Sequence, residues 1–458
     1  MSSNTGIWEY LVALDAQRAR ATTSLLSLRG KAAGLADRHQ GLFALCDQGL
    51  VSATNFATAV IIGRVCGKAE LGVYTLAWTL MTLATDVSGM LTTTPYTVFS
   101  PQLKRSRRRR YLGSILAHQL LLSLTFALAM AAGALLSSWK GWLSDGLSSV
   151  IMTTAGVIVF IGLREFVRRV SFAELKLGWA LAVDVVACVA QAGGLLLLLH
   201  FGALTASRTF ILLGISSAVA AAGWLVLNRR AFRTDKRLLG QDLKRNWSFA
   251  KWVLGSGILS TLARYLYPWV LAAFHGISVT GAWAACAAIV ALGNPAILGL
   301  GNYILPKVSN VYAASGAAAM RRDVRRFSFL FAAVLSPAVL ILAVGGERIV
   351  TGIYGSAYAG NAIVLLLLGL NMLVNSLGNP YSQGLFSLGC AKADTLVNVI
   401  WVALLFTVGI AAVRSYAALG AAAALFVSSS ITAAIRIGVF DREVRCRSGK
   451  TVLPATLS

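Results

Sequence analysis

The sequence predicts an all-α, polytopic membrane protein with about twelve transmembrane helices. The chain of 458 residues is 57% hydrophobic and only 13% charged, with a mean hydropathy of +0.72. A soluble domain carries about 25% charged residues. The apolar residues also form long uninterrupted runs, and about 20 residues of apolar helix are enough to cross the hydrocarbon of a bilayer.

Apolar stretches of this length recur along the whole chain. We expect spans at 42–63, 71–99, 111–136, 149–166, 179–200, 209–228, 253–275, 280–304, 327–345, 361–386, 395–413 and 417–438. Most of the 41 Lys and Arg residues fall in alternate connections between these spans. Because Lys and Arg in short loops mark the cytoplasmic side, we expect both termini to lie in the cytoplasm. Topology then explains the net charge of +24 without a nucleic-acid partner.

The longest internal connection divides the spans into two halves of six. An even number of spans in each half gives both halves the same orientation, which is a parallel repeat. Glycines in the first hairpin of each half match at an offset of 209, namely Gly67 with Gly276 and Gly72 with Gly281. The expected organisation is a cytoplasmic tail at 1–40, a six-helix bundle at 41–228, a basic cytoplasmic linker at 229–252, a second six-helix bundle at 253–438 and a cytoplasmic tail at 439–458.

Polar residues line one face of each helix in the first hairpin. On the first span they are Asp47, Gln48, Ser52, Thr54, Asn55 and Thr58, and on the second Thr75, Thr79, Thr82, Asp86 and Thr93. Residues three or four apart share a helical face. Two neighbouring helices with facing polar stripes would enclose a water-filled space, so the pattern predicts a central cavity.

Three carboxylates accompany these stripes. Asp86 lies well inside the second span, where an unpaired charge would be costly. It is therefore either a cavity residue or a protonated group bonded to a neighbouring helix. Asp47 and Asp184 lie near predicted cytoplasmic helix ends, where we expect solvation. If transport is driven by an ion gradient, Asp86 and Asp47 are the candidate carriers.

Arg264 is the strongest candidate for a substrate-binding residue. It lies near the centre of the predicted span 253–275, too far from either end for its guanidinium to reach the interface easily. Since the guanidinium stays charged, it needs an anion. Either a diphosphate in the cavity or a structural pair with Asp86 would satisfy it.

The tenth span carries amides four residues apart, Asn371, Asn375 and Asn379. Such a row suits sugar hydroxyls and suits interhelical bonding equally well. The basic run Lys104–Arg110 has two explanations, binding of anionic membrane lipid and simple determination of topology. The six cysteines show no paired spacing, so we expect no disulfide framework, no metal site and no cofactor. The tail at 1–40 is either an irregular cytoplasmic segment or an interfacial helix bearing Trp8.

Several short motifs resemble a known family. They are Asp47-Gln48-Gly49-Leu50-Val51-Ser52, Asn55-Phe56, Gly63-Arg64-Val65-Cys66-Gly67, Glu70-Leu71-Gly72-Val73-Tyr74 and Ile353-Tyr354-Gly355-Ser356-Ala357-Tyr358. They look like the corresponding segments of polysaccharide-export flippases of the O-antigen-flippase type. That family belongs to the superfamily of multidrug/toxin extrusion antiporters and lipid II flippases. The resemblance implies two six-helix bundles in a V around a central cavity.

The same resemblance implies a transporter that moves an undecaprenyl-pyrophosphate-linked oligosaccharide across the inner membrane by alternating access. The expected cavity residues are Arg264, Asp86, Asn55, Thr79, Thr82, Asn371 and Asn375. A polysaccharide polymerase and export machinery are the expected protein partners. The nearest alternative is a cation-coupled drug antiporter of the same superfamily. A membrane-embedded glycan polymerase or ligase is a third alternative, but those enzymes need a sizeable outer loop and the predicted loops are short.

Overall fold

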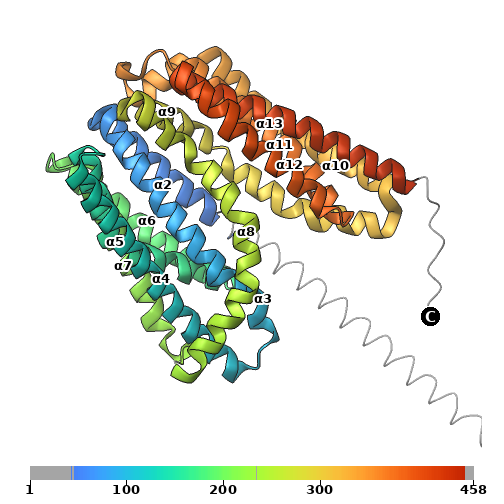
Figure 1. Ribbon diagram of the computed structural model, residues 1–458, viewed down its shortest axis with the longest axis horizontal. Coiled ribbons are helices and arrows are strands. Elements are labelled where there is room, and N and C mark those ends of the chain that lie inside the picture. The colour runs from blue at the N-terminus through green and yellow to red at the C-terminus, as the bar shows by residue number, and fades with distance from the viewer. Residues whose placement is uncertain (1–42, 44–45, 234, 449–458) are drawn as a thin grey trace, which may run out of the picture.

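The computed structural model describes residues 43, 46–233 and 235–448 of the chain (Figure 1). Within these residues the structure is helical, and no strand occurs in them. The expected tail at 1–40, with the alternative of an interfacial helix bearing Trp8, lies outside the described residues. The same is true of 449–458 in the expected C-terminal tail.

The first half of the chain forms one helical lobe, which we call the N-lobe. Its elements are an unlabelled first helix at 46–65, α2 (Gly67–Leu91), α3 (Thr93–Phe99), α4 (Arg105–Lys140), α5 (Asp145–Ala173), α6 (Leu177–His200) and α7 (Ala206–Leu227). Local chemistry explains the helix starts. Ser144 accepts a hydrogen bond from the backbone amide of Leu147, and Thr205 accepts one from that of Arg208, so both act as N-caps.

The second half forms the C-lobe. Its elements are α8 (Lys236–His275), α9 (Ile277–Ala291), α10 (Asn294–Tyr354), α11 (Ala362–Ser387), α12 (Ala391–Leu404), the π segment η4 (Leu405–Gly409) and α13 (Ile410–Ser448). Two of these are pairs of helices joined at a sharp turn. In α10 the chain reverses at Gly316 with φ 76°, and in α13 it breaks at Ala417 with φ 49°. Glycine enters this region of positive φ without strain.

Helix occupies every one of the twelve predicted spans in the described part of the chain. The all-α membrane fold is therefore confirmed. Among the described residues, seven helices are long and apolar enough to cross a membrane. In this count the turned pair of helices in α10 is one helix, and so is the run from α12 to α13. The number of twelve spans stays a prediction.

Helix α8 joins the two lobes. The predicted linker 229–252 contains the short turn η2 (Arg229–Ala231) and is part of α8 from Lys236 onward. The first part of α8 is fixed to α4 by two contacts. Asp242 forms an ion pair with Arg107, and the Tyr111 hydroxyl donates a hydrogen bond to the Asn246 side chain at 2.6 Å. This part of α8 therefore belongs structurally to the N-lobe.

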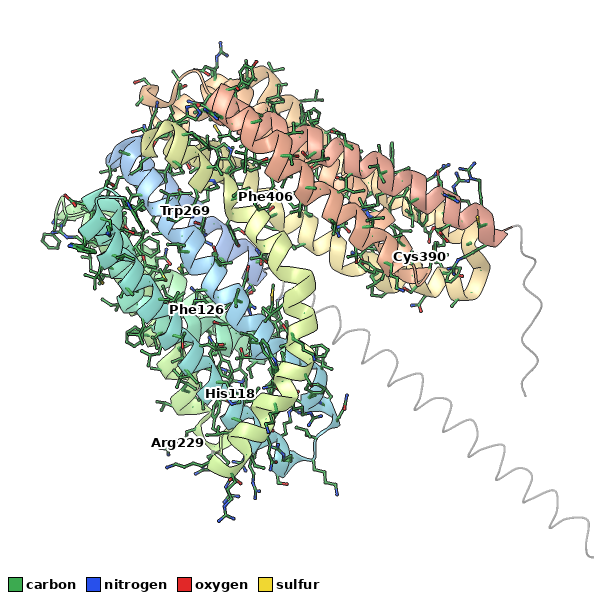
Figure 2. All side chains as sticks on the ribbon, viewed as in Figure 1. His118, Phe126, Arg229, Trp269, Cys390 and Phe406 are labelled. Atoms are coloured by element: carbon green, nitrogen blue, oxygen red, sulfur yellow. The ribbon has the colours of Figure 1, made fainter. Side chains whose placement is uncertain are left out.

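The two lobes meet near α2 and α9 and diverge away from that junction (Figure 1). We call the junction, formed by residues 63–72, 277–281 and 354–358, the sealed end. The opposite ends of the helices carry the Lys- and Arg-rich segments 101–110, 229–251 and 307–326, and we call them the basic end. Figure 2 shows Arg229 and Cys390 at the two separated tips of the basic end.

Candidate functional site

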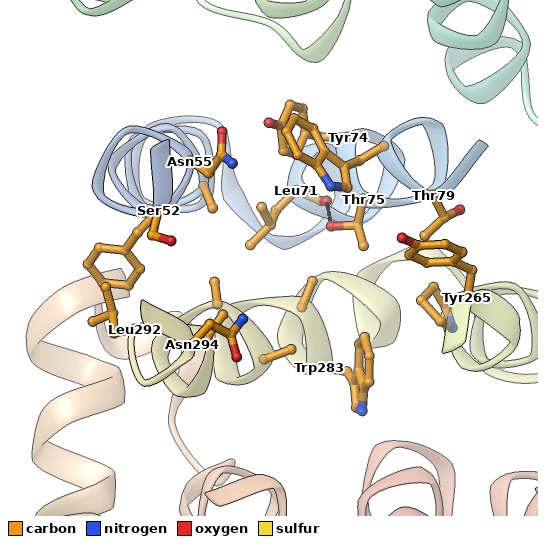
Figure 3. A pocket seen from close by; sticks show the side chains of 18 of the residues that line it. Ser52, Asn55, Leu71, Tyr74, Thr75, Thr79, Tyr265, Trp283, Leu292 and Asn294 are labelled. Atoms are coloured by element: carbon orange, nitrogen blue, oxygen red, sulfur yellow. Dashed lines mark hydrogen bonds between the residues drawn. The ribbon is translucent and has the colours of Figure 1, made fainter. Parts of the chain in front are cut away.

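A cavity of about 500 Å³ lies between the lobes. The first helix and α2 form one wall, and α8, α9 and the start of α10 form the other (Figure 3). Its polar side chains are uncharged: Gln48, Ser52, Asn55, Thr75, Thr79, Tyr74, Tyr265, Trp283 and Asn294 are among them. The cavity thus combines aromatic rings with amides and hydroxyls.

Part of the polar stripes predicted on the first hairpin lines this cavity, namely Gln48, Ser52, Asn55, Thr75 and Thr79. Several hydroxyls of the stripes are already bonded. Thr75 donates to the carbonyl of Leu71 at 2.7 Å (Figure 3), and Thr82 to that of Trp78 at 2.8 Å. Thr79 accepts a 2.8 Å hydrogen bond from the indole of Trp269 on α8. Figure 2 places Trp269 near the junction of the lobes. Thr79 therefore ties α2 to the C-lobe.

A charged recess of about 200 Å³ extends from the cavity into the N-lobe. The two spaces share Val51, Asn55, Trp78 and Tyr265 in their walls. The recess is lined by three guanidinium groups, Arg164, Arg168 and Arg169, against two carboxylates, Asp86 and Glu165. It therefore presents one more positive than negative charge to its interior.

The arginines of the recess form a continuous ion-pair network. Arg168 bonds Asp47 at 2.9 Å and contacts Asp184 at 2.7 Å, and Arg164 bonds Asp184 at 2.6 Å. Arg169 bonds Glu165 at 2.7 Å. Asp86, which pairs with Arg169 at 3.1 Å, is the fourth carboxylate. Four carboxylates and three guanidiniums thus neutralise one another except for one negative charge, as ionic groups removed from water must.

Asp86 is a partly exposed member of this network, like Glu165 and Arg169. Arg169 donates to it at 3.1 Å and the hydroxyl of Tyr265 at 3.4 Å, while Asp86 and Arg169 each keep 30% of their side-chain surface exposed. Tyr265 belongs to α8, so Asp86 is a point where the charged network touches the other wall of the cavity. Asp47 and Asp184, in contrast, are 1% and 0% exposed.

Two expectations from the sequence differ from the structure. The predicted span 149–166 leaves Arg168 and Arg169 outside its helix, but α5 continues to Ala173 and carries Arg164, Arg168 and Arg169 into the recess. Asp47 and Asp184 were expected to be solvated, yet both are buried and paired with arginine. The signal that marks the continuation is apolar: Val170 follows Phe166 by four residues and Val167 by three, and all three are buried on one face of α5.

The structure brings some of the predicted site residues together and separates others. Asn55, Thr82 and Asp86 line the recess, and Asn55 and Thr79 line the cavity. Asn371 and Asn375 line neither space. The Asn375 amide instead donates to the Asn371 side chain and to the Ser429 hydroxyl, both at 3.0 Å. Arg264 belongs to α8, but its side chain lies outside the described part of the structure.

The sealed end closes the space at one side. The hydroxyl of Tyr358 donates to the carbonyl of Gly63 at 3.0 Å, and Arg64 donates to the carbonyl of Gly352 at 3.0 Å. A Cβ added to Gly72 would lie 2.1 Å from the carbonyl oxygen of Ile277, and one added to Gly281 would lie 1.9 Å from that of Lys68. Because residues 68 and 277 are offset by the same 209 positions as the matching glycines, the repeat makes a reciprocal contact with itself.

No protein-family profile and no curated protein matches the sequence. Solved structures do share the fold. An inward-facing multidrug resistance MATE family transporter of the MOP superfamily aligns with a TM-score of 0.69 at 13% identity, covering 90% of this chain and 96% of its own. A MOP superfamily transporter from Pyrococcus furiosus, described as having a binding pocket of reversed polarity, gives 0.64 at 12% identity, covering 89% and 95%. The lipid II flippase MurJ in an inward closed conformation gives 0.61 at 14% identity, covering 88% and 89%. The chain therefore has the fold of MOP-superfamily transporters.

Proposed function

We propose that this protein flips an undecaprenyl-pyrophosphate-linked oligosaccharide across the inner membrane by alternating access, for polysaccharide biosynthesis. The observation that carries the proposal is the junction of two chemically different spaces. An uncharged aromatic and amide cavity opens into a recess lined by three arginines of α5. An oligosaccharide joined to a diphosphate has the same two chemical parts.

The cavity suits the sugar part. Tyr74, Trp78 and Trp283 offer flat apolar faces on which the C–H faces of a pyranose ring can pack, while Gln48 and Asn55 supply amides for sugar hydroxyls. The arginines suit the diphosphate, because guanidinium and phosphate form paired, charge-assisted hydrogen bonds. Arg169 is the accessible guanidinium, with 30% of its side chain exposed.

Asp86 is the first candidate for ion coupling because of its place in the network. Its carboxylate accepts a hydrogen bond from Arg169. A coupling ion bound to Asp86 would compete for this carboxylate, so that Arg169 could donate to a phosphate instead. Asp47, buried behind the recess against Arg168, is the second candidate for ion coupling. We place the basic end in the cytoplasm, following the distribution of Lys and Arg.

Binding by the purified full-length protein tests the proposal. Undecaprenyl diphosphate carrying an oligosaccharide should bind. Arg169→Ala should weaken this binding about 10- to 100-fold, because the variant loses one or two hydrogen bonds between charged groups, each of which contributes on the order of 1 kcal/mol or more. Arg169→Lys should keep part of it. Arg208→Ala, an exposed arginine of α7 that donates to its own loop at Ala203, is the control and should bind normally. Equal binding by Arg169→Ala and the unaltered protein would refute the assignment.

Antiport of an organic cation is the second candidate function. It is favoured by one observation: Asp86 is a partly exposed carboxylate close to the aromatic rings of Trp78 and Tyr265 in one recess wall, a combination that also attracts cations. Tetraphenylphosphonium is the discriminating probe. Binding of this cation that depends on Asp86 and is not displaced by undecaprenyl diphosphate would favour the antiporter.

The cellular setting gives an independent test. Loss of the gene should stop the appearance of a surface polysaccharide and cause accumulation of its lipid-linked precursor, while resistance to cationic dyes stays the same. A polysaccharide polymerase and export machinery are the proposed partners. Reporter enzymes that act only outside the cytoplasm should be inactive when fused at Ser458 and active near Lys140 and Arg348.

A further inference from the structure

The two limbs of α10 enclose a groove that lies apart from the central cavity. Its walls form two connected spaces of about 470 and 620 Å³, which share Asp323, Arg326 and Phe329. The first limb contributes Tyr303, Lys307 and Val311, and the second limb contributes the other lining residues, between Ala319 and Ala333. The limbs reverse at Gly316, at the tip of the C-lobe that is remote from α9 (Figure 1).

The groove changes character along its length. Near the turn it is lined by Arg322 and Arg325, further along by Lys307 and Arg326, and then by Tyr303, Phe329, Leu330 and Ala333. At 1.5 Å per helical residue, Arg326 lies about 15 Å from the turn. Cations thus occupy the end of the groove that belongs to the basic end, and apolar side chains occupy the part directed into the membrane.

The apolar part continues as a stripe that no other element covers. Phe329, Leu340, Ile341 and Val344 are 74%, 64%, 61% and 92% exposed, respectively. These residues recur at spacings that keep them on one face of the second limb. Because so much exposed apolar surface in a membrane protein faces hydrocarbon, the groove opens toward lipid.

The cations of the groove are incompletely neutralised. In the described part of the chain no carboxylate lies within ion-pair distance of Lys307 or Arg322, and Arg326 reaches Asp323 only at 3.9 Å. Arg325 shares Asp441 with Arg321. Apart from Arg325, three cations (Lys307, Arg322 and Arg326) therefore face the groove for its single carboxylate, Asp323. The site thus has a net attraction for an anion.

The basic run at the other lobe shows the opposite arrangement. Arg107, Arg108 and Arg110 are engaged by Asp242, Glu174 and Asp235, respectively. In the run Lys104–Arg110, for which lipid binding was one of two explanations, half of the cations thus form ion pairs with α8 and with the end of α5. The two basic segments both carry many cations, but the cations of the α10 groove have fewer carboxylate partners than those of this run.

We propose that the groove between the limbs of α10 binds one anionic phospholipid of the surrounding leaflet. Lys307 and Arg326 hold the headgroup phosphate, with Arg322 beside them. One acyl chain lies along Phe329, Leu330 and the exposed stripe that follows. A lipid fits better than a soluble phosphate because the cationic part is continuous with an apolar one. The proposal is independent of the transported substrate, since the groove does not open into the cavity between the lobes.

Binding of a fluorescent phosphatidylglycerol to the purified, delipidated full-length protein tests this site. The double variant Lys307→Gln with Arg326→Gln should weaken binding about thirtyfold, from about 1 kcal/mol for each lost cation. The control is Arg229→Gln with Arg230→Gln, which removes the same charge from an exposed turn at the basic end and should leave binding unchanged. The variant Lys307→Arg with Arg326→Lys keeps both charges, so it should still bind phosphatidylglycerol and should unfold at the same temperature as the unaltered protein. This variant distinguishes loss of the lipid site from loss of the fold.

Competition identifies the occupant. Unlabelled phosphatidylglycerol should displace the probe, and zwitterionic phosphatidylethanolamine and inorganic phosphate should not. Phe329→Ala should weaken phosphatidylglycerol binding further. Four outcomes would overturn the proposal: equal loss in the groove variant and the control, full binding by the groove variant, equal displacement by phosphatidylethanolamine, or displacement by undecaprenyl diphosphate at lower concentration than by phosphatidylglycerol. The last outcome would make the groove a carrier-lipid site.

Discussion

The sealed end and the basic end of this protein are held together by different chemistry. Apart from the Arg64 bond to the carbonyl of Gly352, the lobes meet at the sealed end through a tyrosine hydroxyl, backbone carbonyls and glycines. Examples are the bond from Tyr358 to Gly63 and the contact of Gly281 with Lys68. Towards the basic end the ion pairs described above stay within one lobe, if the first part of α8 is counted with the N-lobe. They join α5 to its neighbours and α4 to α8.

This difference indicates which contacts change during transport. Neutral hydrogen bonds contribute about 0.5–1.5 kcal/mol each, so a few of them can be exchanged within the free energy of a conformational step. Breaking a buried ion pair by losing one partner costs about 3–5 kcal/mol. The lobes should therefore move as rigid units, and opening should separate the sealed end. The predictions that follow test this division, beginning with the largest effect.

Loss of Arg168 should destabilise the fold. The Arg168→Ala variant leaves the buried carboxylates of Asp47 and Asp184 without their shared cation, and we expect a loss of about 3–5 kcal/mol in unfolding free energy. The measurement is the midpoint of thermal unfolding in detergent, followed by the reaction of a thiol dye with buried Cys188 and Cys286. Arg208→Ala is the charge-matched control. A midpoint equal to that of the control would show that the network is not structural.

A methyl group at Gly281 should open the sealed end. Its Cβ would lie 1.9 Å from the carbonyl oxygen of Lys68, and overpacking of this kind costs about 1–3 kcal/mol. A cysteine at Thr75 in the cavity, in a background without the six native cysteines, should then react faster with an impermeant thiol reagent added outside intact cells. Gly133→Ala is the matched control, because nothing lies within 4 Å of its added Cβ. The reciprocal variant Gly72→Ala should act in the same direction, and unchanged labelling in both would contradict the reciprocal contact.

Removal of one hydroxyl at the sealed end should have a smaller effect of the same sign. Tyr358→Phe deletes the hydrogen bond to the carbonyl of Gly63 and should shift the equilibrium by about 0.5–1.5 kcal/mol toward the open state. The same cysteine at Thr75 reports the shift. Tyr416→Phe, at a ring that is 68% exposed, is the control. If Tyr358→Phe labels like this control, the bond does not contribute to the seal.

The sequence predicted the helices of the fold better than the contacts between them. Apolar runs and the distribution of Lys and Arg were enough for the all-α membrane class, because the bilayer imposes length and hydropathy on each span. The polar stripes on the first hairpin also contain some of the residues that line the cavity, including Asn55 and Thr79, whereas their members Thr54 and Thr58 line neither space. These signals are local, so one helix at a time is enough to detect them.

The charged recess could not be predicted in the same way. In sequence, Arg164, Arg168 and Arg169 look like residues at the end of an apolar span. Only their partners on other helices, 20 to 121 positions away, show that they belong to an interhelical ion-pair network. Asp184 is likewise paired through tertiary packing, with Arg164 at 2.6 Å. Asn371 and Asn375 show the reverse error. Their spacing fits a cavity face, but packing of α11 against α13 directs Asn375 to Ser429.

Low pH should weaken the ion pairs near the basic end, and a variant of Glu174 can measure this effect. This carboxylate, in the loop after α5, accepts from the Tyr96 hydroxyl at 2.7 Å and pairs with Lys176 at 2.8 Å and Arg108 at 3.1 Å. Burial alone would raise the pKa of Glu174, but the hydrogen bonds from Lys176 and Tyr96 and the nearby positive charges outweigh it and hold the pKa below its ordinary value.

A carboxylate whose pKa is lower in the folded than in the unfolded state stabilises the fold above its unfolded pKa of about 4.3 and loses that contribution as the pH falls through the folded value. The Glu174→Gln variant should therefore be slightly less stable than the unaltered protein at pH 7, by about 0.2–1 kcal/mol for such partly exposed pairs, and the difference should vanish well below pH 4. Labelling of the Thr75 cysteine should not change between the two proteins at pH 7, because Glu174 holds the N-lobe together and takes no part in the seal. A stability difference that grows with acid, or a labelling change at pH 7, would contradict the separation of lobe-holding charges from lobe-joining neutral contacts.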